Sequence, residues 1–197
     1  MSNSKLLEGK VIVVTGAGRG IGRATSLMLA ESGAKVVVND IGGSADGSGN
    51  DATPAQEVVD EIKAAGGDAV ANFDSVTEWE GGQKIIQSAL NTFGRIDGVI
   101  NNAGNLRDVI FHKMTEADFD AVLAVHLKGT FNVSRAAAPI FREQGSGTFV
   151  NMTSTSGLIG NFGQANYAAA KMGIVALARI LAMENGSKNI TANVIAP

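Results

Sequence analysis

The chain contains 197 residues, of which 45% are hydrophobic and 18% are charged, and its formal net charge is −3. A chain of this length and composition can bury roughly 70% of its unfolded surface in a globular fold. Positive and negative side chains are mixed along the sequence, so no basic stripe predicts a nucleic-acid partner.

Membrane and metal partners are not expected either. The apolar runs are shorter than the ~18 residues that cross a bilayer, and the N-terminal segment lacks the apolar core of a signal peptide. We therefore expect a cytoplasmic protein without a membrane partner. The sequence has no cysteine, which excludes disulfides and thiolate chemistry, and its two histidines, His112 and His126, argue against a histidine-based metal site.

Short runs of β-branched residues alternate along the chain with longer amphipathic segments. Some of these segments, such as residues 22–33 and 57–67, end on glycine, as helices prefer. Repeated strand and helix units predict right-handed crossovers and a parallel sheet with helices on both faces, a doubly wound, Rossmann-like α/β fold. The predicted strands are residues 10–15, 35–40, 68–73, 98–102, 148–153 and 190–196.

Residues 41–50, with the sequence IGGSADGSGN, have the composition of a flexible linker. The periodic segments on both sides belong to the same predicted sheet, so we interpret this stretch as a long loop. We find no internal repeat and no domain boundary, and we expect residues 1–197 to form a single domain.

The first predicted strand runs directly into the glycine-rich sequence TGAGRGIG, residues 15–22. In a parallel sheet of this kind, ligands bind at the carboxyl ends of the strands. Gly16, Gly20 and Gly22 allow a tight turn that approaches a pyrophosphate closely, while amides at the start of the next helix face its charge. The spacing G-x-x-x-G-x-G differs from the commoner G-x-G-x-x-G, so a purely structural turn is the alternative.

Asp40 lies at the end of the second predicted strand, twenty residues after Gly20. A carboxylate there accepts hydrogen bonds from a ribose 2′-hydroxyl and repels a 2′-phosphate, so the sequence favours NAD over NADP. Helix capping is the alternative role, but the next helix is predicted to begin near Thr53 or Pro54. Arg19 is evidence against the preference for NAD, because a nearby guanidinium can bind a phosphate.

The single tyrosine of the chain lies in YAAAK, within a predicted helix. Four residues rise ~6 Å along a helix and return to the same face, so Tyr167 and Lys171 point the same way. A phenol keeps its proton at neutral pH, but a neighbouring ammonium and a bound nicotinamide cation both favour the phenolate, which suits a general base. The preceding strand brings Ser154 to the same rim of the sheet, where its hydroxyl can hold a substrate oxygen. Without Ser154, an ordinary amphipathic helix would be the better explanation of the pair.

In this order and at these intervals, TGAGRGIG, NNAG (residues 101–104), Ser154 and YAAAK resemble the motifs of the short-chain dehydrogenase/reductase family over essentially the whole chain. The longer stretches VVVNDIGG, AVANFDSV, VHLKGTF and GNFGQANYAAAK are similar to the (3R)-hydroxyacyl-CoA dehydrogenase part of peroxisomal multifunctional β-oxidation enzymes and to bacterial relatives. The resemblance implies an oxidoreductase domain that transfers a hydride between a secondary alcohol, such as a 3-hydroxyacyl-CoA, and NAD. It also implies a small-molecule substrate and a homodimer or homotetramer.

The resemblance further assigns roles to single residues. Tyr167 would be the acid/base, Lys171 would favour the phenolate and hydrogen-bond the nicotinamide ribose, and Ser154 would orient the carbinol or carbonyl oxygen. With NAD bound, Tyr167 would remove the hydroxyl proton while the carbon gives its hydride to the nicotinamide. No metal ligand is implied.

Two further segments would contact the cofactor. Asp74 and Ser75, at the end of the third strand, would meet the adenine, and Asn102, Ala103 and Gly104 would line the adenosine side of the cofactor. Asp74 could instead cap a helix that begins near Thr77, and NNAG could be only a strand-ending turn. The implied cofactor-binding residues are Gly16, Arg19, Gly20, Ile21, Gly22, Asp40, Asp74, Ser75, Asn102, Ala103, Gly104, Tyr167 and Lys171.

Sheets of this family normally continue beyond the position of Pro197, so we expect the chain to lack the usual C-terminal portion, with its substrate lid and part of an oligomer interface. Other functions stay open. A 3-oxoacyl carrier-protein reductase, or a steroid or sugar alcohol dehydrogenase, has the same cofactor chemistry. A non-catalytic NAD-sensing protein would need Asp40 and the glycines but not Ser154, Tyr167 and Lys171.

His126 stands in VHLKG where the family usually has asparagine, the fourth catalytic member, which holds a bend in a long helix and supports a proton-relay water. An imidazole can titrate near neutral pH and so could join the relay. We instead interpret His126 as a helix-lining residue whose backbone carbonyl alone holds the water, and we expect His126→Asn to preserve turnover within a few fold. Gly129 could help the helix bend in either case.

Overall fold

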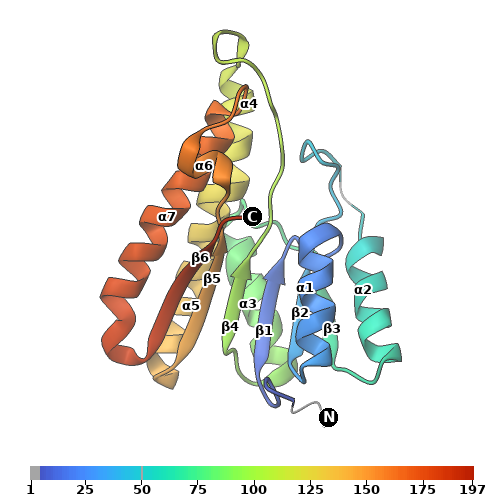
Figure 1. The fold of residues 1–197 in the computed structure, drawn as a ribbon. Coiled ribbons are helices and arrows are strands. Elements are labelled where there is room, and N and C mark those ends of the chain that lie inside the picture. The colour runs from blue at the N-terminus through green and yellow to red at the C-terminus, as the bar shows by residue number, and fades with distance from the viewer. Residues whose placement is uncertain (1–4, 50) are drawn as a thin grey trace.

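The computed structural model describes residues 5–49 and 51–197. Within these ranges, six strands form one parallel sheet in the order β3-β2-β1-β4-β5-β6 (Figure 1). Each strand begins and ends within one residue of its predicted limits, and the doubly wound α/β prediction is confirmed. The strands are β1 (Val11–Thr15), β2 (Lys35–Asn39), β3 (Ala69–Asn72), β4 (Gly98–Asn101), β5 (Gly147–Met152) and β6 (Ile190–Ile195).

Helices cover both faces of the sheet. Two of them, α1 and α2, pack on one face, while α3, α5 and α7 pack on the other. The α-helices are α1 (Gly20–Glu31), α2 (Thr53–Ala64), α3 (Trp79–Phe93), α4 (Glu116–Leu123), α5 (Gly129–Gln144), α6 (Thr155–Ile159) and α7 (Ala165–Asn185). Three shorter segments complete the fold: η1 (Phe111–Lys113), the π-helical η2 (Ala124–Lys128) and η3 (Gly186–Lys188).

The alternation of side chains along β1 divides the core into two layers. Val11 and Val13 belong to a buried cluster with residues of α3 and α5. Ile12 and Val14 face the opposite side, where they pack with residues of α2 such as Val59. Every residue of β1 is buried, which explains why this strand reads as a continuous apolar run.

The helical run from α4 to α5 is interrupted by the π-helical segment η2, which contains His126. A π-helical turn has a wider backbone and commonly accompanies a bend, which is what the sequence predicted here. Gly129, at the start of α5, has ordinary helical dihedral angles. A Cβ atom at this position would lie 2.7 Å from Val76 Cγ2, so glycine is needed for close packing rather than for a special conformation.

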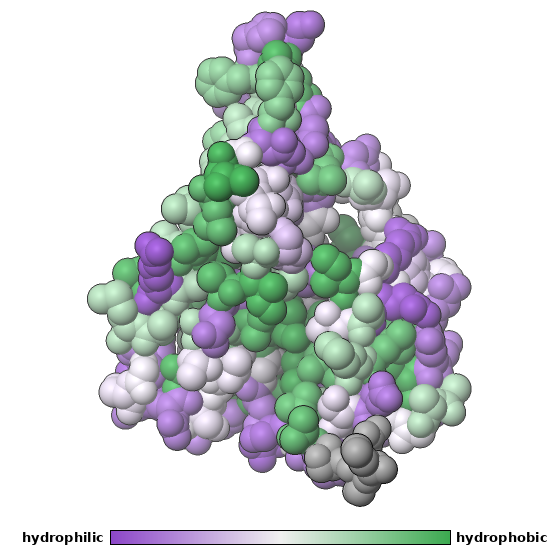
Figure 2. All heavy atoms as spheres, viewed as in Figure 1, coloured by the Kyte–Doolittle hydropathy of each residue, from purple (hydrophilic) through white to green (hydrophobic). Residues whose placement is uncertain are grey.

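α7 corrects the expectation that no apolar segment is long enough to cross a bilayer. By length and composition alone, residues 165–188 are apolar enough to cross a membrane. The same test is passed by core helices of soluble proteins, and here α7 packs against β6, α4 and α6 while carrying Tyr167 and Lys171 into the site. Apolar and polar side chains are mixed on the surface around α6 and α7 (Figure 2). On length and composition alone, this helix is only weak evidence for a membrane-spanning role.

Candidate active site

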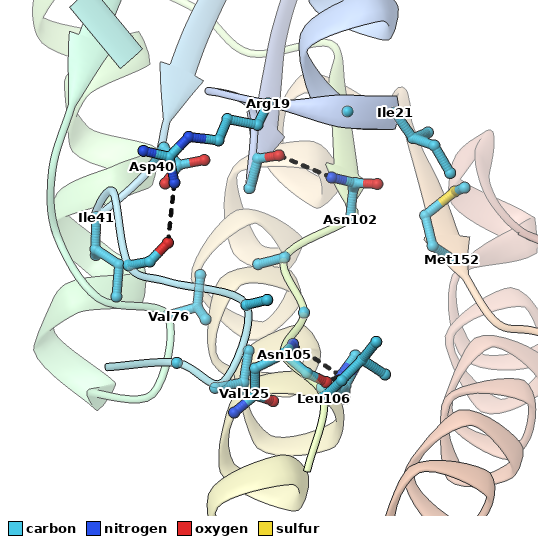
Figure 3. Close-up of a pocket in the computed structure, with 18 of the residues that line it drawn as sticks. Arg19, Ile21, Asp40, Ile41, Val76, Asn102, Asn105, Leu106, Val125 and Met152 are labelled. Carbon is cyan, nitrogen blue, oxygen red and sulfur yellow. Dashed lines mark hydrogen bonds between the residues drawn. The ribbon is translucent and has the colours of Figure 1, made fainter. Parts of the chain in front are cut away.

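The carboxyl ends of the strands border one pocket of about 760 Å³. Figure 3 shows Arg19 and Asp40 next to each other on one side of this pocket, with Ile21 and Met152 together on another side. All the predicted site residues except Gly22 line it. Those that do are Gly16, Arg19, Gly20, Ile21, Asp40, Asp74, Ser75, Asn102, Ala103, Gly104, Ser154, Tyr167 and Lys171.

The three predicted glycines of the first turn have different roles. Gly16 and Gly20 adopt left-handed conformations, with φ of 62° and 52°. A Cβ atom on Gly16 would lie 2.7 Å from Ala103 Cα, whereas one on Gly20 would meet open space. Gly22 lies outside the pocket, and a Cβ atom there would overlap the carbonyl oxygen of Gly16. Gly22 lets α1 pack closely against the turn, and its assignment as a cofactor contact stays a prediction.

The start of α1 fits a pyrophosphate. Its N-cap residue, Arg19, has extended backbone dihedral angles and makes no side-chain capping bond with the described part of the chain. The first amides of a helix lack intrahelical acceptors, and their dipoles favour an anion. Gly20 and Ile21, the first two helical residues, both line the pocket. The backbone therefore offers donors at the point where the sequence predicted the phosphates of a dinucleotide.

Asn102 and Thr15 hold the glycine turn in place. Asn102 Nδ2 donates to the carbonyl oxygen of Gly16 at 2.9 Å (Figure 3) and to that of Thr15 at 3.1 Å. Thr15 Oγ1 accepts from the backbone amides of Asn102 and Ala103, each at 3.1 Å. NNAG is thus more than a turn at the end of a strand, because it fixes the shape of the pocket floor. Sequence reasoning missed the buried Thr15, whose role depends on contacts between two strands.

Asp40 presents a fixed carboxylate to the pocket. Its Oδ2 accepts from the Gly18 amide (2.8 Å) and its Oδ1 from the Gly42 amide (2.7 Å). A carboxylate can accept about four hydrogen bonds, so acceptor capacity remains for ribose hydroxyls. The alternative role as a helix cap is wrong, because α2 begins at Thr53 with Ala52 as its N-cap.

The loop after β2 closes against the segment that follows β4. Arg19 Nη1 donates to Gly43 O at 3.1 Å, which engages the guanidinium with the loop (Figure 3). Further along, Leu106 N donates to Ala45 O at 2.9 Å. The described part of the predicted loop, residues 41–49, is therefore tied down on both sides and forms part of the pocket wall.

Asp74 and Ser75 lie at the end of β3, as predicted, and line the pocket. Asp74 Oδ2 accepts from Asn72 Nδ2 at 2.8 Å, and Ser75 Oγ lies 2.9 Å from Thr77 Oγ1. The capping alternative for Asp74 is wrong, because α3 begins at Trp79 with Glu78 as its N-cap. Both side chains remain available to a ligand from the pocket side.

Tyr167 and Lys171 lie one turn apart on α7 and both line the pocket. Lys171 Nζ lies 5.4 Å from the centroid of the tyrosine ring and donates to Met152 O at 2.6 Å. The lysine side chain is buried, and burial lowers the pKa of Lys171 from 10.5 to about 8. It therefore remains mostly protonated at neutral pH, beside the phenol it was predicted to assist.

Ser154 follows β5 and forms the N-cap of α6. Its Oγ accepts from the Ser156 amide at 3.2 Å, which orients the side chain and leaves its hydroxyl proton free to be donated. Ser154 lines the same pocket as Tyr167, so the structure brings the three predicted catalytic residues together.

His126 lines the pocket, and its side chain lies beside Tyr167. The imidazole lies edge-on to Tyr167, with ring centroids 5.0 Å apart and an interplanar angle of 83°. Its Nε2 lies 2.8 Å from Asn105 O and 3.1 Å from Asn105 N. Burial, and then the charge of Lys171, lower the pKa of His126 from 6.5 to about 4, so the ring is neutral at physiological pH. A Cβ atom on Gly104 would lie 2.5 Å from His126 Cε1, which explains the glycine at this position.

Residues 10–197 match the model of the short chain dehydrogenase family. The chain belongs to this family. Members of this family are oxidoreductases that act on CH–OH groups with a nicotinamide dinucleotide as cofactor, and the chain has the fold of the family. Among the described residues, no group of three or more histidine or acidic side chains could hold a metal ion.

Three relatives illustrate the range of the family. The peroxisomal hydratase-dehydrogenase-epimerase of Saccharomyces cerevisiae is 55% identical over 197 residues, which is 100% of this chain but 22% of the yeast protein. A 3-oxoacyl-[acyl-carrier-protein] reductase of Synechocystis is 41% identical over 191 residues, covering 97% of this chain and 74% of that protein. The solved structure of a 7α-hydroxysteroid dehydrogenase, complexed with NADH and 7-oxo glycochenodeoxycholic acid, is 34% identical with a TM-score of 0.90, covering 100% of this chain and 73% of the other.

Proposed function

We propose that the chain is the catalytic domain of an NAD-dependent dehydrogenase that interconverts a secondary alcohol and its ketone, with a 3-hydroxyacyl-CoA as substrate. One observation carries the proposal. Ser154, Tyr167 and Lys171 lie in the same pocket as Asp40 and the uncapped start of α1. Acid/base groups and a dinucleotide cradle are thus placed for a single reaction.

NAD rather than NADP is supported by the wall around Asp40. The carboxylate is held by two backbone amides and would repel the additional phosphate of NADP. The guanidinium of Arg19, which could compensate, donates to a loop carbonyl instead. When bound, NAD supplies the hydride acceptor.

In the direction of oxidation, Tyr167 as a phenolate removes the hydroxyl proton of the substrate. The Lys171 ammonium, fixed by the carbonyl of Met152, favours the phenolate through its positive charge. Ser154 donates its hydroxyl proton to the substrate oxygen and stabilises the negative charge that develops there. His126, neutral and edge-on to the tyrosine, limits the movement of the ring.

The proposed acyl substrate is supported by exposed apolar side chains in and after α6. Leu158, Ile159 and Phe162 are 52%, 86% and 84% exposed, and they follow Ser154 closely in the chain. An alkyl chain that leaves the pocket on this side would contact apolar surface (Figure 2). Coenzyme A as the carrier of that chain is supported by the sequence resemblance to (3R)-hydroxyacyl-CoA dehydrogenases and by the similarity to the yeast hydratase-dehydrogenase-epimerase.

A 3-oxoacyl carrier-protein reductase is the second candidate, favoured by the identity to the Synechocystis enzyme. NADH formation should be measured with a 3-hydroxyacyl-CoA, the matching carrier-protein thioester and a hydroxysteroid, with NAD and with NADP. We expect the highest kcat/KM for the coenzyme A thioester with NAD. A higher kcat/KM for the carrier-protein thioester would reassign the substrate, and no turnover of any of them would contradict the proposed function.

We also propose that the chain associates into a homodimer or homotetramer. Exposed apolar residues on α7, including Met172 and Met183 at 47% and 79% exposure, support a buried interface there. Sedimentation equilibrium should show a dimer or tetramer, and charged substitutions at both methionines should shift it toward the monomer. A wild-type protein that is already monomeric, like the doubly substituted variant, would contradict this part of the proposal.

A further inference from the structure

Asn166, the residue before Tyr167, is completely buried, and both polar atoms of its side chain form hydrogen bonds at the start of α7. Its Nδ2 donates to Arg107 O and to Asp118 O, both at 3.0 Å. Its Oδ1 accepts from the backbone amide of Tyr167 at 2.8 Å. Both amide protons and the carbonyl oxygen are thus engaged within the protein.

The contact with the Tyr167 amide replaces an ordinary helix cap. α7 begins at Ala165, and its N-cap residue, Gln164, provides no side-chain acceptor to the first-turn amides in the described structure. These amides have no intrahelical partner, so each one needs an acceptor from elsewhere. Asn166 supplies the acceptor for Tyr167 from inside the first turn.

The two carbonyls that Asn166 holds belong to different elements. Asp118 lies in α4, and Arg107 lies in the segment that follows β4. The neighbouring residue Leu106 lines the cofactor pocket and bonds the loop after β2 through Ala45 O. One side chain therefore connects the backbone of the proton acceptor to the wall of the cofactor pocket.

We propose that Asn166 is a positioning residue for Tyr167, which fixes the phenol relative to the cofactor pocket by clamping the first turn of α7 to Arg107 and Asp118. The inference rests on the proposed dehydrogenase function. Only an amide side chain can donate twice and accept once in this geometry. Aspartate would keep the acceptor but lose both donors and bury a charge, and alanine would remove all three hydrogen bonds that hold the first turn of α7.

A matched control exists near the other end of the same helix. Asn185 is also buried, with 4% exposure. Its Nδ2 donates to Leu181 O at 2.9 Å and its Oδ1 accepts from Arg142 Nη1 at 2.8 Å. It lies nineteen residues from Asn166, or about 28 Å along the helix. Asn185→Ala should destabilise the protein in a similar way without moving Tyr167.

The only tyrosine of the chain provides a readout that needs no substrate. In protein labelled with ¹³C and ¹⁵N at tyrosine, the NMR ring signals and the amide signal all come from Tyr167. We expect Asn166→Ala and Asn166→Asp to shift or broaden the ring signals, while Asn185→Ala leaves them at the wild-type position. We also expect the Tyr167 amide of the wild-type protein to be protected from hydrogen exchange, because Asn166 accepts its hydrogen bond.

Kinetics should be measured with an alcohol that the wild-type protein oxidises. Asn166→Ala should lower kcat at least tenfold and change KM for NAD by less than threefold. Asn185→Ala should change neither kcat nor KM. The proposal would be overturned if the Tyr167 ring signals of the folded Asn166 variants kept their wild-type positions. It would also be overturned if Asn185→Ala shifted these signals as much as the Asn166 variants do. If neither Asn166 variant folds, hydrogen exchange of the Tyr167 amide in the wild-type protein tests the proposal. Rapid exchange of this amide would contradict the clamp, and protection from exchange would support it. A wild-type chain that turns over no alcohol would refute the proposed function while the NMR experiments still test the clamp.

Discussion

The buried imidazole of His126 should make the stability of the protein sensitive to acid. Its pKa is lowered from 6.5 to about 4, first by burial and then by the charge of Lys171. Between these two values the unfolded chain binds a proton that the native state does not, so stability falls as the pH is lowered through this window. Integrated from pH 6.5 to pH 4, the loss is about 2.5 kcal/mol.

The measurement compares the wild-type protein with His126→Asn. Urea unfolding of both, followed by the fluorescence of the single tryptophan, gives two free energies of unfolding at each pH. Carboxylates with lowered pKa values, such as Asp97, affect both proteins alike and cancel in the difference. The wild-type value minus the variant value should fall by about 2.5 kcal/mol between pH 6.5 and pH 4. A constant difference across this range would refute the reasoning, because His126 would then titrate in the native state as it does in the unfolded chain.

Three further predictions concern the cofactor and the relay. NAD should bind at least tenfold more tightly than NADP, a difference of roughly 1.4 kcal/mol, and equal or reversed affinities in a fluorescence titration would remove the role given to Asp40. His126→Asn should keep kcat within a few fold; loss of activity, or of a titration near neutral pH, would instead place the imidazole in the proton relay. Gly22→Ala, whose Cβ would overlap Gly16 O, should weaken NAD binding at least tenfold, whereas Gly186→Ala enters open space and should leave it unchanged. Equal affinities in the two glycine variants would show that the close approach of α1 is not required.

The strands and the catalytic helix could be predicted from the sequence because their signals are local. Buried β-branched runs such as residues 11–15 leave little choice of structure, and the four-residue spacing of Tyr167 and Lys171 determines that they share one side of α7. The glycine turn was recognised in the same way. The structure then removed the capping alternatives for Asp40 and Asp74, because the helices after them begin elsewhere.

Other features depend on contacts between segments far apart in the chain. Thr15 and Asn166 act through backbone groups of other elements, and no local pattern marks them. Gly22 was predicted to contact the cofactor because it belongs to the glycine motif, and the structure adds a packing role that the sequence did not indicate. The π-helical segment around His126 was also not predicted. These features are determined by hydrogen bonds and packing between segments, which the composition of a single segment does not reveal.

The central claim is that Tyr167 is the acid/base of a hydride-transfer site that binds NAD. The most direct measurement compares turnover and NAD affinity in the wild-type protein and in Tyr167→Phe, which removes the phenol oxygen and keeps the ring beside His126 and Lys171. We predict nearly unchanged NAD affinity and a fall in kcat of ~100-fold or more. A variant that retains most of the wild-type rate would contradict the claim, since another group would then have to move the proton.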